Sequence, residues 1–77
     1  MVNIRYSIRM NTKKTLHEVK KEVNEMFSEL KNITITRNIG DTINIQIKTN
    51  KPYRNLKNRI QIIGKVELFH MITGKAV

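Results

Sequence analysis

Hydrophobic and polar residues alternate strictly along residues 33–47. Isoleucines fall on one side of this stretch, and Thr, Asn and Gln residues fall on the other. A period of two residues is typical of a strand that buries one face. Gly40 and Asp41 interrupt the alternation in the middle, so the pattern predicts a β-hairpin with one apolar and one polar face.

The loop of this hairpin decides which residues face each other. A two-residue turn would place Ile39 opposite Thr42, which is an apolar–polar mismatch. A three-residue loop over 39–41 places Asn38 opposite Thr42 and aligns the isoleucines of both strands. Because a slip by one residue would turn every side chain to the other face, we predict the three-residue loop. Arg37 is the one misfit, since it would point towards the apolar side.

Two further segments alternate in the same way, residues 2–10 and residues 65–72, and both predict half-buried strands. The polar side of the first strand carries Asn3, Arg5, Ser7 and Arg9. One side of the second is expected to carry Val66, Leu68 and His70, and the other side Phe69 and Met71. We expect residues 72–77 to form a frayed tail.

Helical spacing replaces alternation in residues 15–31, where an apolar stripe is formed by Leu16, Val19, Val23, Met26, Phe27 and Leu30. Thr15 and Glu18 fit a capping box at its start. A shorter helix is predicted from Pro52, which suits a first helical position, to Gly64, which suits the position after the end. Residues 60–63, three isoleucines and Gln61, are also compatible with a strand.

The predicted order is therefore β-α-β-β-α-β, in a single domain over residues 1–77. Helices on one face of an antiparallel sheet make a two-layer α+β sandwich. The order is that of ferredoxin-like folds, whose usual strand order places the first and third strands in the centre. If the second helix were a strand, a single helix packed on a meander would be the alternative.

Charge is unevenly distributed along the chain. Fifteen Lys and Arg residues against six acids give a net charge of +9. Residues 13–31 hold five Lys and four Glu, whereas the other 58 residues hold ten basic residues against Asp41 and Glu67. Such a positive field favours polyanionic partners. The alternative is that a composition rich in Ile, Lys and Asn reflects the coding bias of an AT-rich genome.

Catalytic and metal chemistry find little support in the sequence. There is no Cys for a thiolate site, and His17 and His70 have no cluster of carboxylates beside them. Ser7 and Ser28 have no predicted His base. The loop after the first strand also lacks the glycine that acylphosphatases, which share this topology, use to hold phosphate. We therefore expect no enzyme activity, no metal and no cofactor.

We expect a small basic protein that binds DNA or RNA through the polar sheet face and the 48–59 segment. The candidate phosphate contacts are Arg5, Arg9, Lys48, Lys51, Arg54, Lys57 and Arg59. Arginine can hold a phosphate with two parallel hydrogen bonds. The central strands offer no aromatic residue for base stacking of the kind used by RNA-recognition motifs. Against this hypothesis, antiparallel sheets often expose one polar face to water without binding anything.

The alternative function is a protein-interaction module, such as a phage or mobile-element accessory or inhibitor protein that binds an acidic host protein. An exposed edge strand would also permit a homodimer. No stretch reaches the roughly 18 apolar residues of a membrane helix, and the N-terminus does not resemble a signal peptide. We therefore expect a cytoplasmic protein without a membrane partner.

Overall fold

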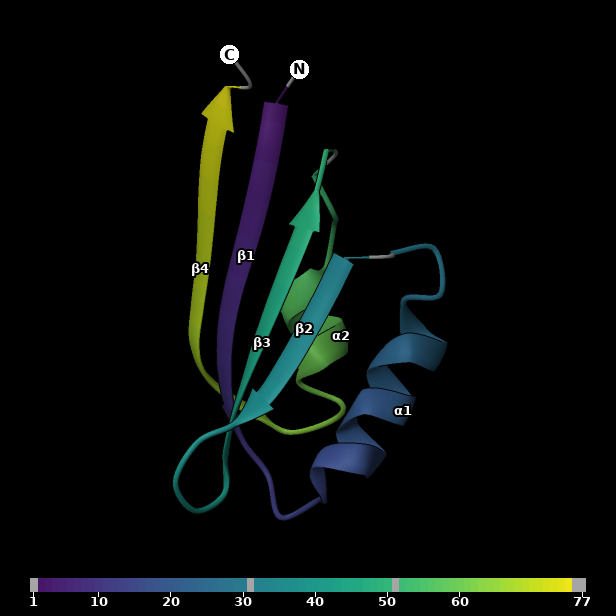
Figure 1. Ribbon diagram of the computed structural model, residues 1–77, viewed down its shortest axis with the longest axis vertical. Helices are drawn as coiled ribbons and strands as arrows, with labels where there is room; N and C mark the ends of the chain where they lie inside the picture. Colours follow the sequence, from purple (N-terminus) through teal and green to yellow (C-terminus); the bar gives the residue numbers. More distant parts are fainter. Residues whose placement is uncertain (1, 31, 51, 76–77) are drawn as a thin grey trace.

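Four antiparallel strands form one sheet in the order β2-β3-β1-β4, and two helices pack behind it (Figure 1). The computed structural model describes residues 2–30, 32–50 and 52–75. Its elements are β1 (Val2–Asn11), α1 (Leu16–Met26), β2 (Asn32–Arg37), β3 (Thr42–Thr49), α2 (Leu56–Ile60) and β4 (Lys65–Lys75). Neither of these helices is long and apolar enough to span a membrane. The α+β class predicted from the sequence is confirmed.

The hydrophobic core lies between the sheet and the helices. Successive side chains of a strand point to opposite faces of the sheet, so alternate residues of β1 and β3 point into the core. The strands contribute Ile4, Tyr6, Ile8, Met10, Ile35, Ile43, Ile45 and Ile47. The helices and the segments after them contribute Val19, Val23, Phe27, Leu56, Ile60 and Ile63. Both helices therefore cover the same face of the sheet, and the other face stays open.

The register predicted for the β2–β3 hairpin is confirmed. Ile35 pairs with Ile45, and the other predicted pairs from Ile33 to Arg37 are also present. The backbone N–H of Asn38 donates to the carbonyl oxygen of Thr42 at 2.8 Å, which closes the three-residue loop.

Arg37, the misfit of the hairpin pattern, does not enter the core. Its side chain is exposed, and its guanidinium Nη1 donates to the carbonyl oxygen of Gly40 at 2.8 Å. Nη2 donates to the carbonyl oxygen of Lys14 in the loop between β1 and α1. The long side chain thus reaches past the apolar face and ties two loops together.

The start of α1 follows the prediction, but its end does not. Thr15 accepts a hydrogen bond from the backbone N–H of Glu18, whose side chain accepts from Thr15 in return, as in a capping box. The helix ends at Met26 rather than continuing to residue 31. Phe27 leaves the helical conformation, with φ −122° and ψ 52°, and its ring is fully buried.

The second helix is much shorter than predicted, because residues 52–55 are not helical. The backbone N–H of Tyr53 donates to the hydroxyl oxygen of Tyr6 at 2.9 Å. Asn55 adopts a left-handed conformation with φ 59° directly before Leu56, where the helix begins. Burial raises the pKa of the Tyr6 hydroxyl, so this hydroxyl stays neutral to a higher pH than an exposed tyrosine does. Residues 61–63 form a turn and not a strand.

The faces predicted for the last strand are reversed over much of its length by a β-bulge. Met10 pairs with Val66, but Arg9 pairs with Leu68, so Glu67 is an extra residue in β4. Beyond the bulge, Phe69 packs towards the core, whereas Leu68 lies on the open face and is exposed.

The C-terminal part of β4 was also predicted incorrectly. We expected residues 72–77 to fray, but Ile72 to Lys75 pair with β1 as far as Val2. Residues 76–77 lie outside the described residues. The β1–β4 pair consequently extends past the end of β3, which stops at Thr49 opposite Ile4.

Candidate functional site

The face of the sheet that points away from the helices, here called the outer face, is ordered into rows by the strand pairing. Three rows cross it from β2 to β4: Asn32–Lys48–Arg5–Ile72, Thr34–Gln46–Ser7–His70 and Thr36–Asn44–Arg9–Leu68. Their side chains are exposed or partly exposed. None of these twelve residues is a carboxylate, and two of the rows carry cations. The outer face is polar from β2 to β1, and its β4 end carries the apolar Leu68 and Ile72.

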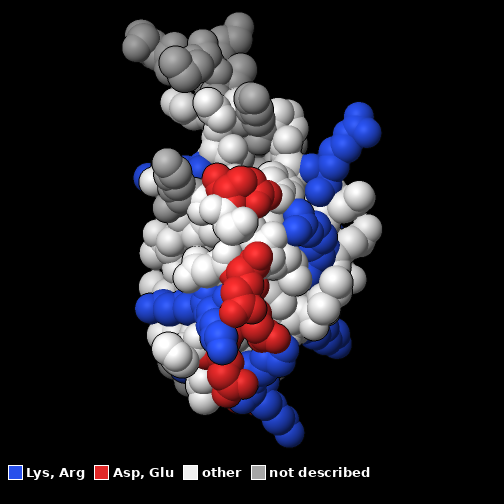
Figure 2. Space-filling view, turned by 90° about the vertical axis from the view of Figure 1, so that its right-hand side faces the viewer, with Lys and Arg blue, Asp and Glu red and all other residues white. Residues whose placement is uncertain are grey.

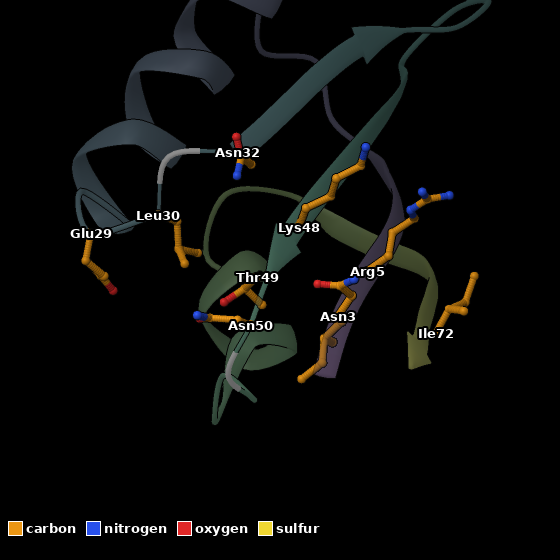
Figure 3. A pocket seen from close by; sticks show the side chains of 10 residues that line it. Asn3, Arg5, Glu29, Leu30, Asn32, Lys48, Thr49, Asn50 and Ile72 are labelled. Carbon is orange, nitrogen blue, oxygen red and sulfur yellow. The ribbon is translucent and has the colours of Figure 1, made fainter. Parts of the chain in front are cut away.

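Arg5 and Lys48 form the strongest positive feature of the outer face. They lie directly opposite each other on β1 and β3. Both side chains extend in a similar direction, away from the sheet (Figure 3). Opposite residues of an antiparallel pair have Cβ atoms about 4.5–5.5 Å apart, and like charges at such positions cost stability. The pair therefore concentrates positive charge at a point where folding alone does not favour it.

A groove opens beside this pair, at the end of the sheet where β3 stops and β1 continues. Its volume is about 800 Å³. Its polar lining consists of Asn3, Arg5, Glu29, Asn32, Lys48, Thr49 and Asn50 (Figure 3). Amide side chains both donate and accept hydrogen bonds, and the two cations supply charge. On its Arg5 and Lys48 side the groove can thus offer donors to an anionic ligand with several oxygen atoms, whereas Glu29 adds one carboxylate to the lining.

Asn32 and Asn50 were not among the residues singled out from the sequence. Asn32 pairs with Lys48 and so belongs to the same row as Arg5. Extending the predicted hairpin register by one pair beyond Ile33 would have found it. Asn50 follows the last residue of β3, where no sequence pattern marks a role.

Arg9 lies on the same face as Arg5 but in a different setting. Four residues along a strand separate them, which corresponds to about 13 Å. Arg9 lines an open hollow near the hairpin together with Arg37 and Glu67. This hollow thus holds two cations and one carboxylate, the same balance as the groove beside Arg5, whose lining includes Lys48 and Glu29.

The other candidates of the 48–59 segment are not on the outer face. After Lys48 the chain passes behind the sheet. Arg54 and Lys57 border a hollow with Phe69 and Met71, in the layer of the helices. Both side chains are exposed. Lys51 lies outside the described residues. The structure therefore brings Arg5 and Lys48 together and separates Arg54 and Lys57 from them.

Arg59 has internal partners. Its guanidinium donates from Nη1 to the Tyr53 hydroxyl and from Nη2 to the carbonyl oxygen of Met26, both at 2.7 Å. It also lies 4.6 Å from the centroid of the Phe27 ring. The Tyr53 hydroxyl in turn donates to the Glu29 carboxylate. These contacts connect α2 to the end of α1, so the guanidinium of Arg59 has a structural role.

Replacing Arg59 by Ala is expected to lower the free energy of unfolding by about 2 kcal/mol, because hydrogen bonds from a charged donor and a cation–π contact are lost together. The matched control is Lys57→Ala, whose exposed side chain on the same helix is expected to change stability by less than about 0.5 kcal/mol. Urea unfolding followed by circular dichroism measures both. Equal effects of the two substitutions would contradict a structural role for Arg59.

Acidic side chains gather on the α1 side of the molecule. Figure 2 shows them as a band along this side, flanked by Lys and Arg. The helix and the turn after it supply Glu18, Glu22, Glu25 and Glu29. One of them, Glu22, forms an ion pair with Lys14 at 2.9 Å. Glu18, Glu22 and Glu25 are thus positioned by α1, in the layer that the outer face points away from, whereas Glu29 follows the helix and lines the groove beside Arg5 and Lys48.

Ser7 and His70 lie opposite each other in the middle row, a neighbourhood that the sequence did not reveal. A serine nucleophile needs a base and a third group that orients the base. The remaining members of the row are Thr34 and Gln46, and neither is a carboxylate. Within the described parts of the chain, no three His, Asp or Glu residues are grouped so as to hold a metal ion.

Comparison with protein-family models, with curated proteins and with solved structures found no match to this chain. A function is consequently inferred from the surface itself.

Proposed function

We propose that this protein binds nucleic acid through its outer face, with Arg5 and Lys48 contacting phosphates. The observation that carries the proposal is the pairing of these two cations across β1 and β3, in a row without a carboxylate and beside an open polar groove. Phosphate contacts of this kind supply most of the affinity in non-specific binding.

The rest of the outer face suits backbone contact better than base reading. Thr, Asn, Gln and Ser side chains can donate to phosphate and sugar oxygens. Base stacking needs exposed aromatic rings. Phe69, the candidate ring on β4, faces the core side instead, where its centroid lies 5.7 Å from that of Tyr6. The proposed contact is therefore dominated by phosphates and has little sequence preference.

Arg9 is a second anchor in this proposal. Its distance of about 13 Å from Arg5 along β1 is close to the width of a DNA major groove, about 12 Å. Arg54 and Lys57 contribute long-range attraction from the helix layer but no contact on the outer face. The proposed contact residues are thus Arg5, Lys48 and Arg9.

The test is binding of fluorescent duplex DNA and duplex RNA at several salt concentrations. We expect log K to fall linearly with log salt. The double substitution Arg5→Gln and Lys48→Gln is expected to reduce that slope by about 2, since each lost phosphate contact removes about one unit. The control is Arg54→Gln with Lys57→Gln, which removes the same charge from the helix layer.

Two results would overturn the proposal. One is an absence of binding to either nucleic acid at low salt. The other is an equal loss of affinity and slope in the two double variants, which would mean that net charge and not the outer face drives binding. If this chain captures a single acidic protein, and the capture persists after nuclease treatment, the result would favour a protein-interaction module instead.

For the fold, we infer a ferredoxin-like arrangement within the α+β class. Its support is the position of β1 and β3 as central strands and the placement of both helices on one face. In such an arrangement the outer face is the surface left free for ligands.

A further inference from the structure

β4 is the most exposed edge of the sheet. It pairs with β1 on one side, and no other described element borders its opposite side (Figure 1). An edge strand presents a row of backbone N–H and C=O groups that are free to pair with another strand. With eleven residues, β4 is long for such an edge.

The usual protection of an edge strand is missing over the central part of β4. Residues 68–73 contain no charged residue and no proline. Three large apolar side chains are about half exposed there: Leu68 at 48%, Met71 at 51% and Ile72 at 50%. The opposite edge, β2, has only six residues and ends in Arg37. Charge and short length protect that edge, whereas the charged residues of β4, Lys65, Glu67 and Lys75, and its bulge lie outside residues 68–73.

We propose that β4 pairs antiparallel with β4 of a second copy of this chain, with His70 of each copy on the two-fold axis. A two-fold axis perpendicular to a sheet places one residue opposite itself. His70 is the midpoint of β4, which spans residues 65 to 75, so this register uses the whole strand. The proposed binding partner of the β4 edge is thus β4 of an identical chain.

This register matches side chains on both faces of the joined sheet. Leu68 would face Ile72 of the partner subunit on the outer face. Phe69 would face Met71 of the partner subunit on the inner face. Apolar cross-strand pairs of this kind each contribute roughly 0.2–1 kcal/mol. A register centred on Leu68 would instead place Glu67 opposite Phe69 and leave Met71 and Ile72 without apolar partners.

Charge also favours this edge over other surfaces for self-association. With a net charge of +9, two copies repel each other in most orientations. Residues 68–73 bring no like charges together across the axis, and Glu67 would face the uncharged Thr73 of the partner subunit. The like-charged pair of this register, Lys65 with Lys75 of the partner subunit, lies at the two ends of the joined strands, farthest from the axis. The paired sheets would form one eight-stranded sheet, with both outer faces on the same side.

The absence of cysteine makes a site-directed cross-link possible. His70→Cys would place a thiol opposite itself, with a Cα separation of about 4.5–5.5 Å, which lies within the range of a disulfide. We expect this variant to form a covalent dimer under mild oxidation. Thr36→Cys, exposed on the outer face of β2, is the control and is expected to remain mostly monomeric.

Sedimentation velocity of the nuclease-treated wild-type chain over a range of concentrations tests the dimer without cross-linking. We expect the mass to double with rising concentration, and the pair Leu68→Lys with Ile72→Lys to abolish this doubling. Both side chains are half exposed, and circular dichroism checks that the variant stays folded. A wild-type chain that remains monomeric, or equal cross-linking of His70→Cys and Thr36→Cys, would overturn the proposal.

Discussion

Phe27→Ala is expected to destabilise the protein by about 3–5 kcal/mol, because the removal of a fully buried ring leaves a cavity that the surrounding core closes only in part. The ring also meets Tyr53 edge-on, with 5.4 Å between centroids, and carries the Arg59 guanidinium on its face. For a domain of 77 residues, total stability is of the order of 4–12 kcal/mol. The substitution thus removes much of what holds the chain folded.

Urea unfolding measures this loss, with Phe27→Leu as the matched control. Leucine keeps most of the apolar volume but loses the aromatic contacts, so a cost of about 1–1.5 kcal/mol is expected. A loss below about 1 kcal/mol for Phe27→Ala would show that the end of α1 is not packed against α2 as described.

Gly64→Val is expected to cost about 3 kcal/mol, because the backbone at Gly64 approaches β1 too closely for a side chain. A Cβ atom there would lie 2.9 Å from the Met10 sulfur, 3.0 Å from Cβ of Thr12 and 3.1 Å from the carbonyl oxygen of Asn11. Met10 is fully buried and has little room to move. Overpacking of this kind forces shifts of side chain and backbone.

Gly40→Ala separates this steric effect from backbone preference. Gly40 has φ +71°, but a methyl group at this position would have no atom within 4 Å, so only the left-handed conformation is penalised, by about 1 kcal/mol. Thermal or urea unfolding of both variants gives the comparison. A smaller effect for Gly64→Val than for Gly40→Ala would refute the close approach.

The role of Gly64 in the structure differs from the role that the sequence suggested. Its position after an apolar helical stripe suggested the end of a helix. The helix ends at Ile60, and the glycine is needed instead where the chain passes β1 on its way into β4. The sequence shows that a glycine is present, but only the packed structure shows which atoms exclude a side chain.

The candidate site was predictable only in part. Alternation along β1 already placed Arg5 and Arg9 on a polar face. Their neighbours across the sheet depended on the pairing of β1 with β3, which lies more than thirty residues further along the chain. The separation of Arg54 and Lys57 from that face depended on where the chain crosses between layers. No local sequence pattern indicates where the chain passes from the sheet to the helix layer.

The sequence by itself determined the hairpin register and the start of α1. Both depend on residues that are close along the chain: isoleucines matched across a three-residue loop, and a side chain that caps the N–H three residues later. Local geometry restricts such features to few alternatives, and a slip would expose a whole apolar face. The α+β class followed from the same periodicities.

Only the tertiary structure decided the faces of β4 and the start of α2. The bulge at Glu67 arises from the pairing of β4 with β1, and it turns Phe69 inward and Leu68 outward against the simple alternation. Residues 52–55 remain outside α2 because the backbone N–H of Tyr53 donates a hydrogen bond to the hydroxyl of Tyr6, a residue of β1. In both places a partner distant in sequence outweighs the local preference, since burial and hydrogen bonding are satisfied by the whole fold.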